Sequence, residues 1–175
     1  MSYEFISAAH ITAAVISLVT GAVVVLWQKG TYRHKVIGYC YVAAMLTLNI
    51  TALLIYRLTG SFGPFHVMAL ISLGGLLAGF APALLRRPDW LKQHLNGMAW
   101  SYIGLLMAAA SELAVRLPNA PFWPGVFVGS GLFYITGWYV LVRNRPRLLS
   151  RHGSVGAQPG APADGPASLR EAGRG

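Results

Sequence analysis

Five long runs of apolar residues, separated by short polar segments, dominate the pattern along the chain. Each run is close to the ~20 residues that an α-helix needs to cross the hydrocarbon core of a membrane. The segments between them carry the charges, prolines and glycines typical of turns. Because no water satisfies backbone groups inside a bilayer, such a chain must fold as a helix bundle. The pattern predicts an all-α, polytopic membrane protein with five spans and a four-helix core, at residues 5–27, 36–56, 65–85, 91–115 and 123–142.

The composition agrees with this class. Charged residues make up 11% of the 175 residues, whereas soluble domains carry about a quarter. The mean hydropathy is +0.52, and Cys40, the only cysteine, cannot form a disulfide within the chain. From Ser150 onward the sequence is rich in glycine, alanine, proline and serine and has little to bury. We therefore expect a helix bundle over residues 1–149 and a disordered tail over residues 150–175.

The basic residues predict the orientation of the spans. The net charge is +9, but the cationic side chains lie in short loops and in the tail instead of forming one basic face, so nucleic acid is not an expected partner. With the N-terminus outside, only Arg57 and Arg116 fall on the outer side, which is the asymmetry of the positive-inside rule. We expect a multi-pass protein of the inner (cytoplasmic) membrane with a cytoplasmic C-terminus. The twelve inner residues are Lys29, Arg33, Lys35, Arg86, Arg87, Lys92, Arg143, Arg145, Arg147, Arg151, Arg170 and Arg174.

Four histidines alternate between the two ends of consecutive spans. His10 and His66 fall at the outer ends of the first and third spans, and His34 and His94 fall at the inner ends of the second and fourth. In an up-and-down bundle, alternate helices are diagonal neighbours. Each diagonal would then present two imidazoles at one membrane depth, which is a suitable axial ligand set for haem iron. The pattern predicts two non-covalent b-type haems, with His10 and His66 as iron ligands of the outer one and His34 and His94 of the inner one.

The surroundings of these histidines suit a porphyrin. Gly38 and Gly97 share a helix face with His34 and His94, and small residues there would leave room for a macrocycle. Arg33, Lys35 and Lys92 lie at the inner end and are expected to bind the propionates.

The same residues also have simpler interpretations. A histidine at a membrane boundary is often an amphipathic anchor with its ring tip among the headgroups. Glu112 is a candidate for proton movement because acids inside a membrane are commonly functional, but an ion pair with Arg116 or Arg57 would explain it equally well. Asn49 is expected to make an interhelical hydrogen bond.

The chain also resembles two known groups of proteins. The stretches WQKGTYRHKVIGYCYVAAM and KQHLNGMAWSYIGLLMAA, with Lys29, Gly30, His34, Gly38 and Tyr39 in the first and His94 in the second, resemble a bacterial family of predicted membrane proteins, domain of unknown function 2306. That resemblance implies a topology and no activity. The arrangement of histidines is similar in architecture to the cytochrome b561 superfamily, whose members hold two haems between alternate helices of a four-helix core, although the sequence motifs of that superfamily are missing.

The leading hypothesis is a transmembrane electron-transfer protein, an oxidoreductase of the cytochrome b561 type if it is an enzyme. Besides the lipid bilayer, its partners would be a quinone or another redox donor or acceptor, and a homo-oligomer is compatible with the sequence. One alternative is a small transporter or permease accessory protein that handles protons or a metal ion, for which a polar site at the midplane is expected. Another is a non-catalytic membrane scaffold or assembly protein without haem.

Overall fold

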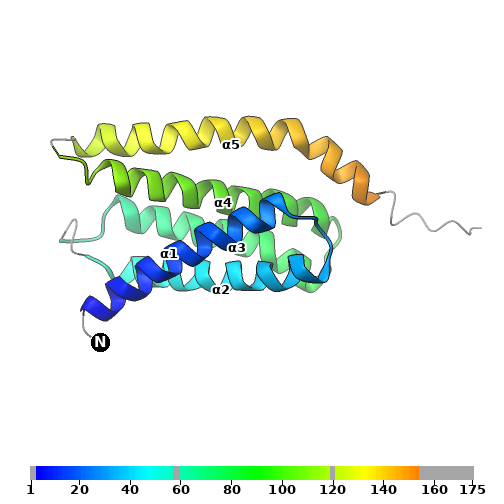
Figure 1. The fold of residues 1–175 in the computed structure, drawn as a ribbon, viewed down its shortest axis with the longest axis horizontal. Coiled ribbons are helices and arrows are strands. Elements are labelled where there is room, and N and C mark those ends of the chain that lie inside the picture. The colour runs from blue at the N-terminus through cyan, green and yellow to red at the C-terminus, as the bar shows by residue number, and fades with distance from the viewer. Residues whose placement is uncertain (1–2, 57–59, 119–120, 154–175) are drawn as a thin grey trace, which may run out of the picture. The chain divides into compact units, whose positions relative to one another are not determined.

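The structure, a computed structural model, describes residues 3–56, 60–118 and 121–153, with side chains as far as residue 146. All the regular structure in these residues is helical, and each of the five predicted helices is confirmed, with a start within four residues of the expected one (Figure 1). The helices are α1 (Tyr3–Leu26), α2 (Tyr32–Leu54), α3 (Pro64–Leu85), α4 (Trp90–Ala114) and α5 (Phe122–Gly153).

The end of α5 differs from the prediction. The helix continues through Pro146 to Gly153, so the first four residues of the expected tail are helical. The remainder of that tail, residues 154–175, lies outside the described residues. By its internal contacts the chain divides into Met1–Arg143 and Asn144–Gly175, and the four-helix core lies within the first of these units.

Helices α1 to α4 form the expected four-helix core. α1 packs against α2, α2 against α3 and α3 against α4, while α4 also touches α1 and closes the ring. The diagonals of this core are therefore α1 with α3 and α2 with α4, as the up-and-down arrangement predicts.

Helix α5 lies against α4. The side chain of Ser111 on α4 is within hydrogen-bonding distance of Ser130 on α5, at 2.7 Å. A Cβ atom on Gly129 would lie 2.9 Å from the backbone of Ala110, so the absence of a side chain at Gly129 lets the two helices approach closely, as small residues do in membrane bundles.

Four helices of the described part are long and apolar enough to cross a membrane: α1, α2, α3 and α5 as far as Pro146. α4 has the length but is more polar. Of its residues only Lys92, Gln93 and Leu113 are exposed, because α1, α3 and α5 surround it. A membrane helix that faces protein instead of lipid can carry polar side chains, because they find partners on the neighbouring helices.

The backbones of α3 and α4 approach each other closely. A Cβ atom on Gly79 would lie 2.6 Å from the backbone nitrogen of Met98, and one on Gly97 would overlap the backbone of Gly79. The two glycines therefore set the α3–α4 crossing. This contact corrects the expectation that Gly97 leaves room for a porphyrin, because the backbone of α3 fills that space.

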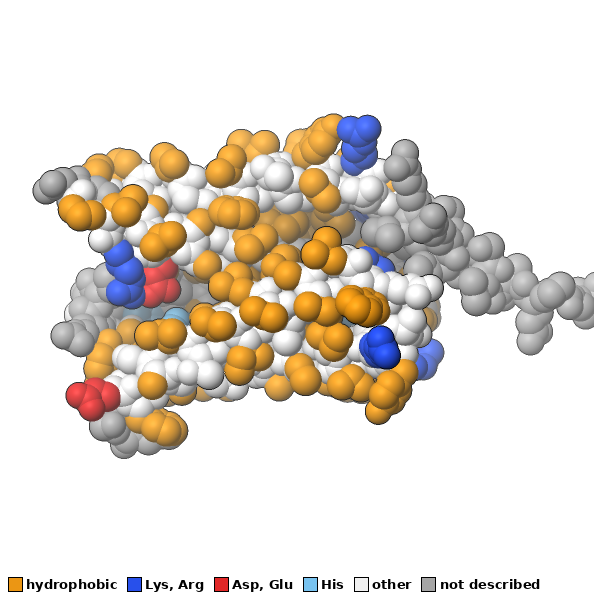
Figure 2. All heavy atoms as spheres, viewed as in Figure 1, with side chains coloured by type: hydrophobic (Ala, Val, Ile, Leu, Met, Phe, Trp, Pro, Cys, Tyr) orange, Lys and Arg blue, Asp and Glu red, His pale blue; other side chains and the backbone are white. Residues whose placement is uncertain are grey.

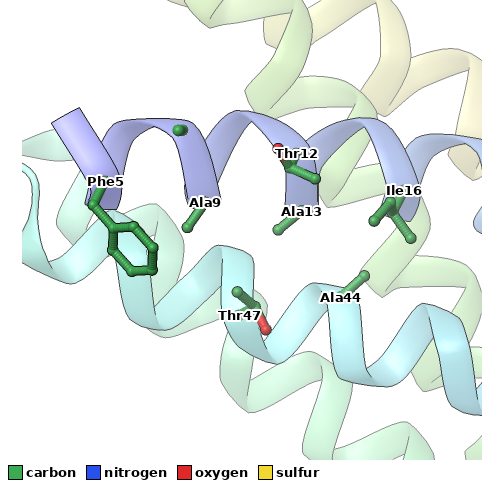
Figure 3. A pocket seen from close by; sticks show the side chains of 8 residues that line it. Phe5, Ala9, Thr12, Ala13, Ile16, Ala44 and Thr47 are labelled. Carbon is green, nitrogen blue, oxygen red and sulfur yellow. The ribbon is translucent and has the colours of Figure 1, made fainter.

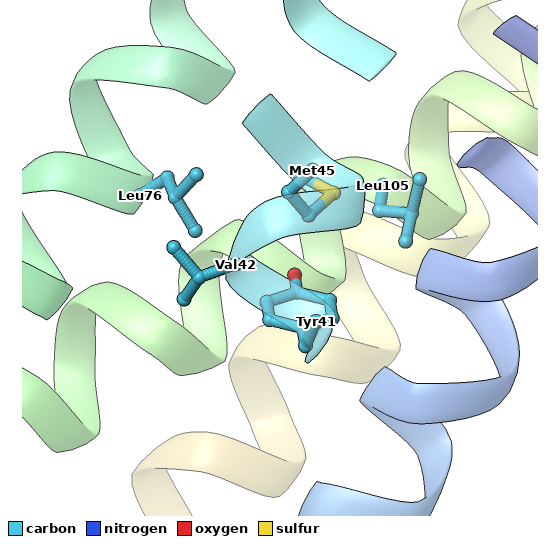
Figure 4. Close-up of a cluster of buried hydrophobic side chains, with 5 residues drawn as sticks. All are labelled: Tyr41, Val42, Met45, Leu76 and Leu105. Carbon is cyan, nitrogen blue, oxygen red and sulfur yellow. The ribbon is translucent and has the colours of Figure 1, made fainter. Parts of the chain in front are cut away.

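The centre of the bundle is apolar and closely packed. Tyr41, Val42, Met45, Leu76 and Leu105 pack together there, each less than 7% exposed (Figure 4). Outward-facing side chains are also mainly apolar (Figure 2). A hydrophobic exterior around a packed interior is what a lipid-embedded bundle requires.

Candidate functional site

The inner histidines, His34 on α2 and His94 on α4, lie side by side across a diagonal of the core. Their ring centres are 6.5 Å apart and their planes are inclined by 82°. Two imidazoles that bind one metal ion at about 2 Å per nitrogen have ring centres roughly 6 Å apart. The spacing of this pair thus suits a shared metal ion, and its inclination is compatible with rotation about each metal–nitrogen bond.

Local structure positions the backbone of His34 and the ring of His94. The N-cap residue of α2, Thr31, accepts a hydrogen bond from the backbone N–H of His34 at 3.1 Å, which fixes the start of the helix that carries this histidine. The Nδ1 atom of His94 lies 3.0 Å from the carbonyl oxygen of Gly79. Because a carbonyl can only accept, Nδ1 carries the proton and Nε2 keeps its lone pair. Metal-binding histidines commonly have this arrangement.

Gly38, one turn from His34, has no close neighbour on another helix. A Cβ atom on Gly38 would meet nothing within 4 Å, so α2 has open space one turn from His34. Trp90 lies at the start of α4 with its ring centre 6.4 Å from that of His94, and the guanidinium of Arg86 lies over the Trp90 ring at 5.5 Å. The inner pair is thus connected to the basic end of the bundle by an aromatic side chain.

The predicted propionate partners lie at this same end. Arg33 and Lys35 are exposed in the first turn of α2, and Lys92 is exposed in the first turn of α4. The three cations therefore lie within a few residues of His34 and His94 along the chain.

At the other end of the bundle, His10 is held by α2. Its Nδ1 atom is 3.0 Å from the hydroxyl oxygen of Thr51, and this hydroxyl lies 2.7 Å from the carbonyl of Thr47, to which it donates. Since the single hydroxyl proton is used in that bond, the oxygen of Thr51 accepts from Nδ1–H of His10. His10 therefore also keeps a lone pair on Nε2.

Glu112 forms an ion pair with Arg116, four residues further along α4. Both charged groups act electrostatically on His10. The predicted ion pair between Glu112 and Arg116 is thus confirmed. The Glu112 carboxylate also lies close enough to His10 to influence it. Arg57, the other expected outer cation, lies outside the described residues.

His66 is buried, with 3% of its surface exposed. Its ring packs against Tyr56 and Phe62, at 4.6 Å and 5.1 Å between ring centres. Its Nδ1 atom accepts a hydrogen bond from the backbone N–H of Gly63 at 3.1 Å, while its Nε2 atom is buried and makes no hydrogen bond within the described chain. An anchor with its ring tip among lipid headgroups would be exposed, so that interpretation does not describe His66 in this structure.

The two diagonal pairs differ in their packing. His34 and His94 are in ring contact, whereas α1 and α3, which carry His10 and His66, do not pack against each other within the described residues. Across the same part of the chain, no three histidine, cysteine, aspartate or glutamate side chains come together as a metal-binding group.

Sequence reasoning missed a polar contact between the two levels. The hydroxyl groups of Tyr41 on α2 and Ser101 on α4 are 3.0 Å apart and buried. Tyr41 follows His34 by seven residues and Ser101 follows His94 by seven, so each lies on the face of its histidine, two turns deeper. That shared spacing is the signal that could have predicted this diagonal contact.

A shallow apolar hollow of about 420 Å³ opens between α1 and α2 (Figure 3). Alanine and threonine side chains line most of it, and none of the four histidines does. An open hollow of this kind on a membrane-facing surface suits a lipid chain better than a polar substrate. The lining residues are Phe5, Ala8, Ala9, Thr12, Ala13, Ile16, Ala44 and Thr47.

Comparison with known proteins identifies a family. The family described as "Predicted membrane protein (DUF2306)" matches residues 7–146, four fifths of the chain. No curated protein and no solved structure matches the chain, and the similarity to cytochrome b561 proteins therefore finds no support.

Proposed function

We propose that this chain, which belongs to the DUF2306 family of predicted membrane proteins, carries electrons across a membrane by means of b-type haems bound at two histidine levels. The observation that carries this proposal is the contact between His34 and His94, both half-buried, with ring centres 6.5 Å apart. When bound, a haem supplies a one-electron iron centre whose potential depends on its ligands and its burial.

The proposed topology has five spans. α4 is 25 residues long, or about 37 Å at ~1.5 Å per residue, enough to cross a bilayer. Its polarity is acceptable because neighbouring helices cover it. With five spans, the distribution of lysine and arginine favours an outer N-terminus and a cytoplasmic C-terminus in the inner (cytoplasmic) membrane.

The inner site fits a haem in several respects. Nε2 of His94 is available as a ligand because Nδ1–H is bonded to Gly79. Open space lies beside Gly38, and Arg33, Lys35 and Lys92 are exposed cations in the first turns of the same helices, where they suit anionic propionates. The chain's part in the chemistry is to bind the group, to orient the imidazoles and to exclude water.

The outer site fits through His10, whose Nε2 atom is likewise available because Thr51 accepts from Nδ1–H. His66 lies at the same end of α2, next to Tyr56, two residues beyond the helix. The Nδ1 atom of His66 accepts a backbone hydrogen bond, so His66 can bind the same iron as His10 only if its Nε2 atom carries no proton.

The closely packed and mainly apolar layer between the levels favours electron transfer over transport of ions or polar solutes. His34 and Thr51, which mark the two levels on α2, are seventeen residues apart, or about 25 Å at ~1.5 Å per residue. Met45, Leu76 and Leu105 fill the core between them with at most 3% of their surface exposed. A packed apolar core of this kind blocks ions and water, whereas electrons need no aqueous path.

The first experiment is a reduced-minus-oxidised visible spectrum of the purified protein, expressed with an adequate supply of haem. We expect a Soret band and about two haems per chain. His34→Ala and His94→Ala should each reduce the haem content by half, whereas His152→Ala, a histidine near the end of α5, is the matched control and should retain it. A protein without a Soret band would end the proposal.

A further inference from the structure

A tryptophan connects the inner histidines with the basic surface at their end of the bundle. Trp90, the first residue of α4, has its ring centre 6.4 Å from that of His94. The guanidinium of Arg86 lies over the indole ring of Trp90, 5.5 Å from its centre. Because Arg86 is exposed and both Trp90 and His94 are half-buried, the three side chains lead from the surface to the inner pair.

The turn between α3 and α4 holds Trp90 in this position. Arg86 ends α3 in the left-handed conformation, with a φ of 51°, and the backbone N–H of Arg87 donates to the carbonyl of Pro82 at 3.2 Å. The backbone N–H of Trp90 then donates to the carbonyl of Arg87 at 3.1 Å. These hydrogen bonds fix the start of α4, and they place the indole on the helix face of His94, one turn before it.

The surface around Trp90 is cationic. Arg86, Arg87 and Lys92 are exposed in this turn and in the first turn of α4, and Asp89 is the acid among them. An excess of positive charge attracts anions from solution and raises the rate of their encounter by about 10- to 1000-fold, less so at high salt. A negatively charged reaction partner would therefore be drawn to the exposed side of Trp90.

We infer that Trp90 is the point at which an anionic one-electron carrier exchanges its electron with the inner level. The inference rests on the proposed function, since the electron passes to or from a haem bound by His34 and His94. The cations of the turn attract the carrier, and the indole provides a path to the ring of His94. One electron moves from the reduced to the oxidised partner; no bond forms or breaks, no proton moves, and the indole itself is neither oxidised nor reduced.

A tryptophan at a membrane boundary can also be a simple interfacial anchor. Trp27, just beyond α1 at the same end of the bundle, is 47% exposed and has the environment expected of such an anchor. Trp90 differs from it, because it is half-buried and in ring contact with His94. Trp27 is therefore the matched control for both tests.

The first test needs no haem. The fluorescence of Trp90, measured as the difference between the parent protein and Trp90→Phe in an uncharged detergent, should be quenched by the anion iodide. Arg86→Asn, a residue that tolerates the left-handed backbone at this position, should weaken that quenching about twofold to threefold at constant low ionic strength. Quenching by neutral acrylamide, and the response of Trp27 to iodide, should not change. Iodide quenching of Trp90 that Arg86→Asn leaves as it was would overturn the inference.

The second test follows oxidation of the reduced, haem-loaded protein by the anion ferricyanide; the phase that His34→Ala removes belongs to the inner haem. At low salt, Arg86→Asn should slow that phase about tenfold, but should not slow oxidation by the cation hexaammineruthenium(III). With ferricyanide, Trp90→Leu should slow the phase, Trp90→Phe should retain most of the rate, and Trp27→Leu should leave it unchanged. Equal rates for Trp90→Leu and Trp27→Leu would refute the inference and leave the electron-transfer proposal intact, whereas a protein without haem would refute both.

Discussion

The contact between α3 and α4 leads to a prediction that can be worked out from distances. A Cβ atom added at Gly79 would lie 2.6 Å from the backbone nitrogen of Met98, whereas ordinary contacts begin at 3.4 Å. In Gly79→Ala the helices must therefore separate by about 0.8 Å, because backbone atoms cannot turn aside as a side chain can. Overpacking of this kind typically costs about 1–3 kcal/mol of folding stability.

The same displacement should affect the inner histidine. The Gly79 carbonyl is 3.0 Å from Nδ1 of His94, and a shift of about 0.8 Å would stretch this distance beyond the ~3.2 Å limit of a useful hydrogen bond. In ¹⁵N spectra, His94 should then lose its fixed Nδ1–H tautomer. The apparent melting temperature in detergent should fall by several degrees.

Gly75→Ala is the matched control. Gly75 lies one turn earlier on α3, and a Cβ atom there would meet nothing within 4 Å. Replacing a helical glycine by alanine without a clash stabilises a helix by roughly 0.5–1 kcal/mol, so this variant should melt at or above the temperature of the parent protein. Equal melting temperatures for the two variants would refute the claim that Gly79 sets the helix crossing.

Three further predictions concern the core and the topology. Tyr41→Phe removes a buried hydrogen bond and leaves the Ser101 hydroxyl without that partner, so the free energy of unfolding should fall by about 1–3 kcal/mol. Tyr39→Phe, at an exposed position on the same helix, should have no measurable effect. Equal effects of the two changes would contradict the buried contact. Leu76→Ala should lower the free energy of unfolding by about 2–5 kcal/mol, because it opens a cavity. Leu77→Ala, on the exposed face, should lower it far less. Similar denaturation midpoints for the two variants would disprove the close packing around Leu76. A cytoplasm-specific reporter fused to the C-terminus should be active, and an active periplasmic reporter at that position would reverse the proposed orientation.

The sequence alone predicts the helices well and their contacts less well. The length of each apolar run predicts its helix, because the thickness of the bilayer fixes the length of a span. Pro64 is the first residue of α3, where the missing N–H of proline is tolerated. The end of α5 could not be predicted in this way, because the helix continues into polar sequence beyond the apolar run. The polarity of α4 likewise becomes understandable only when its neighbours are known.

The sequence likewise predicts only part of the candidate site. The alternation of histidines predicts that His34 and His94 face each other, and the structure confirms their contact. The sequence cannot predict which glycine gives space: Gly38 is open, whereas Gly97 is filled by the backbone of α3. Nor can it predict that His66 accepts a hydrogen bond from Gly63, because ring orientation depends on the local geometry at the start of α3.

Electron transfer from one membrane face to the other can be measured in sealed vesicles that contain the purified, haem-loaded protein and enclose a membrane-impermeant oxidant such as ferricyanide. When a membrane-impermeant reductant is added outside, the enclosed oxidant should be reduced much faster than in protein-free vesicles. His34→Ala and His94→Ala, at the best-formed site, should bring the rate down to that of the protein-free control. If the haem-loaded protein leaves the reduction of the oxidant at the protein-free rate, the bundle does not carry electrons across the membrane.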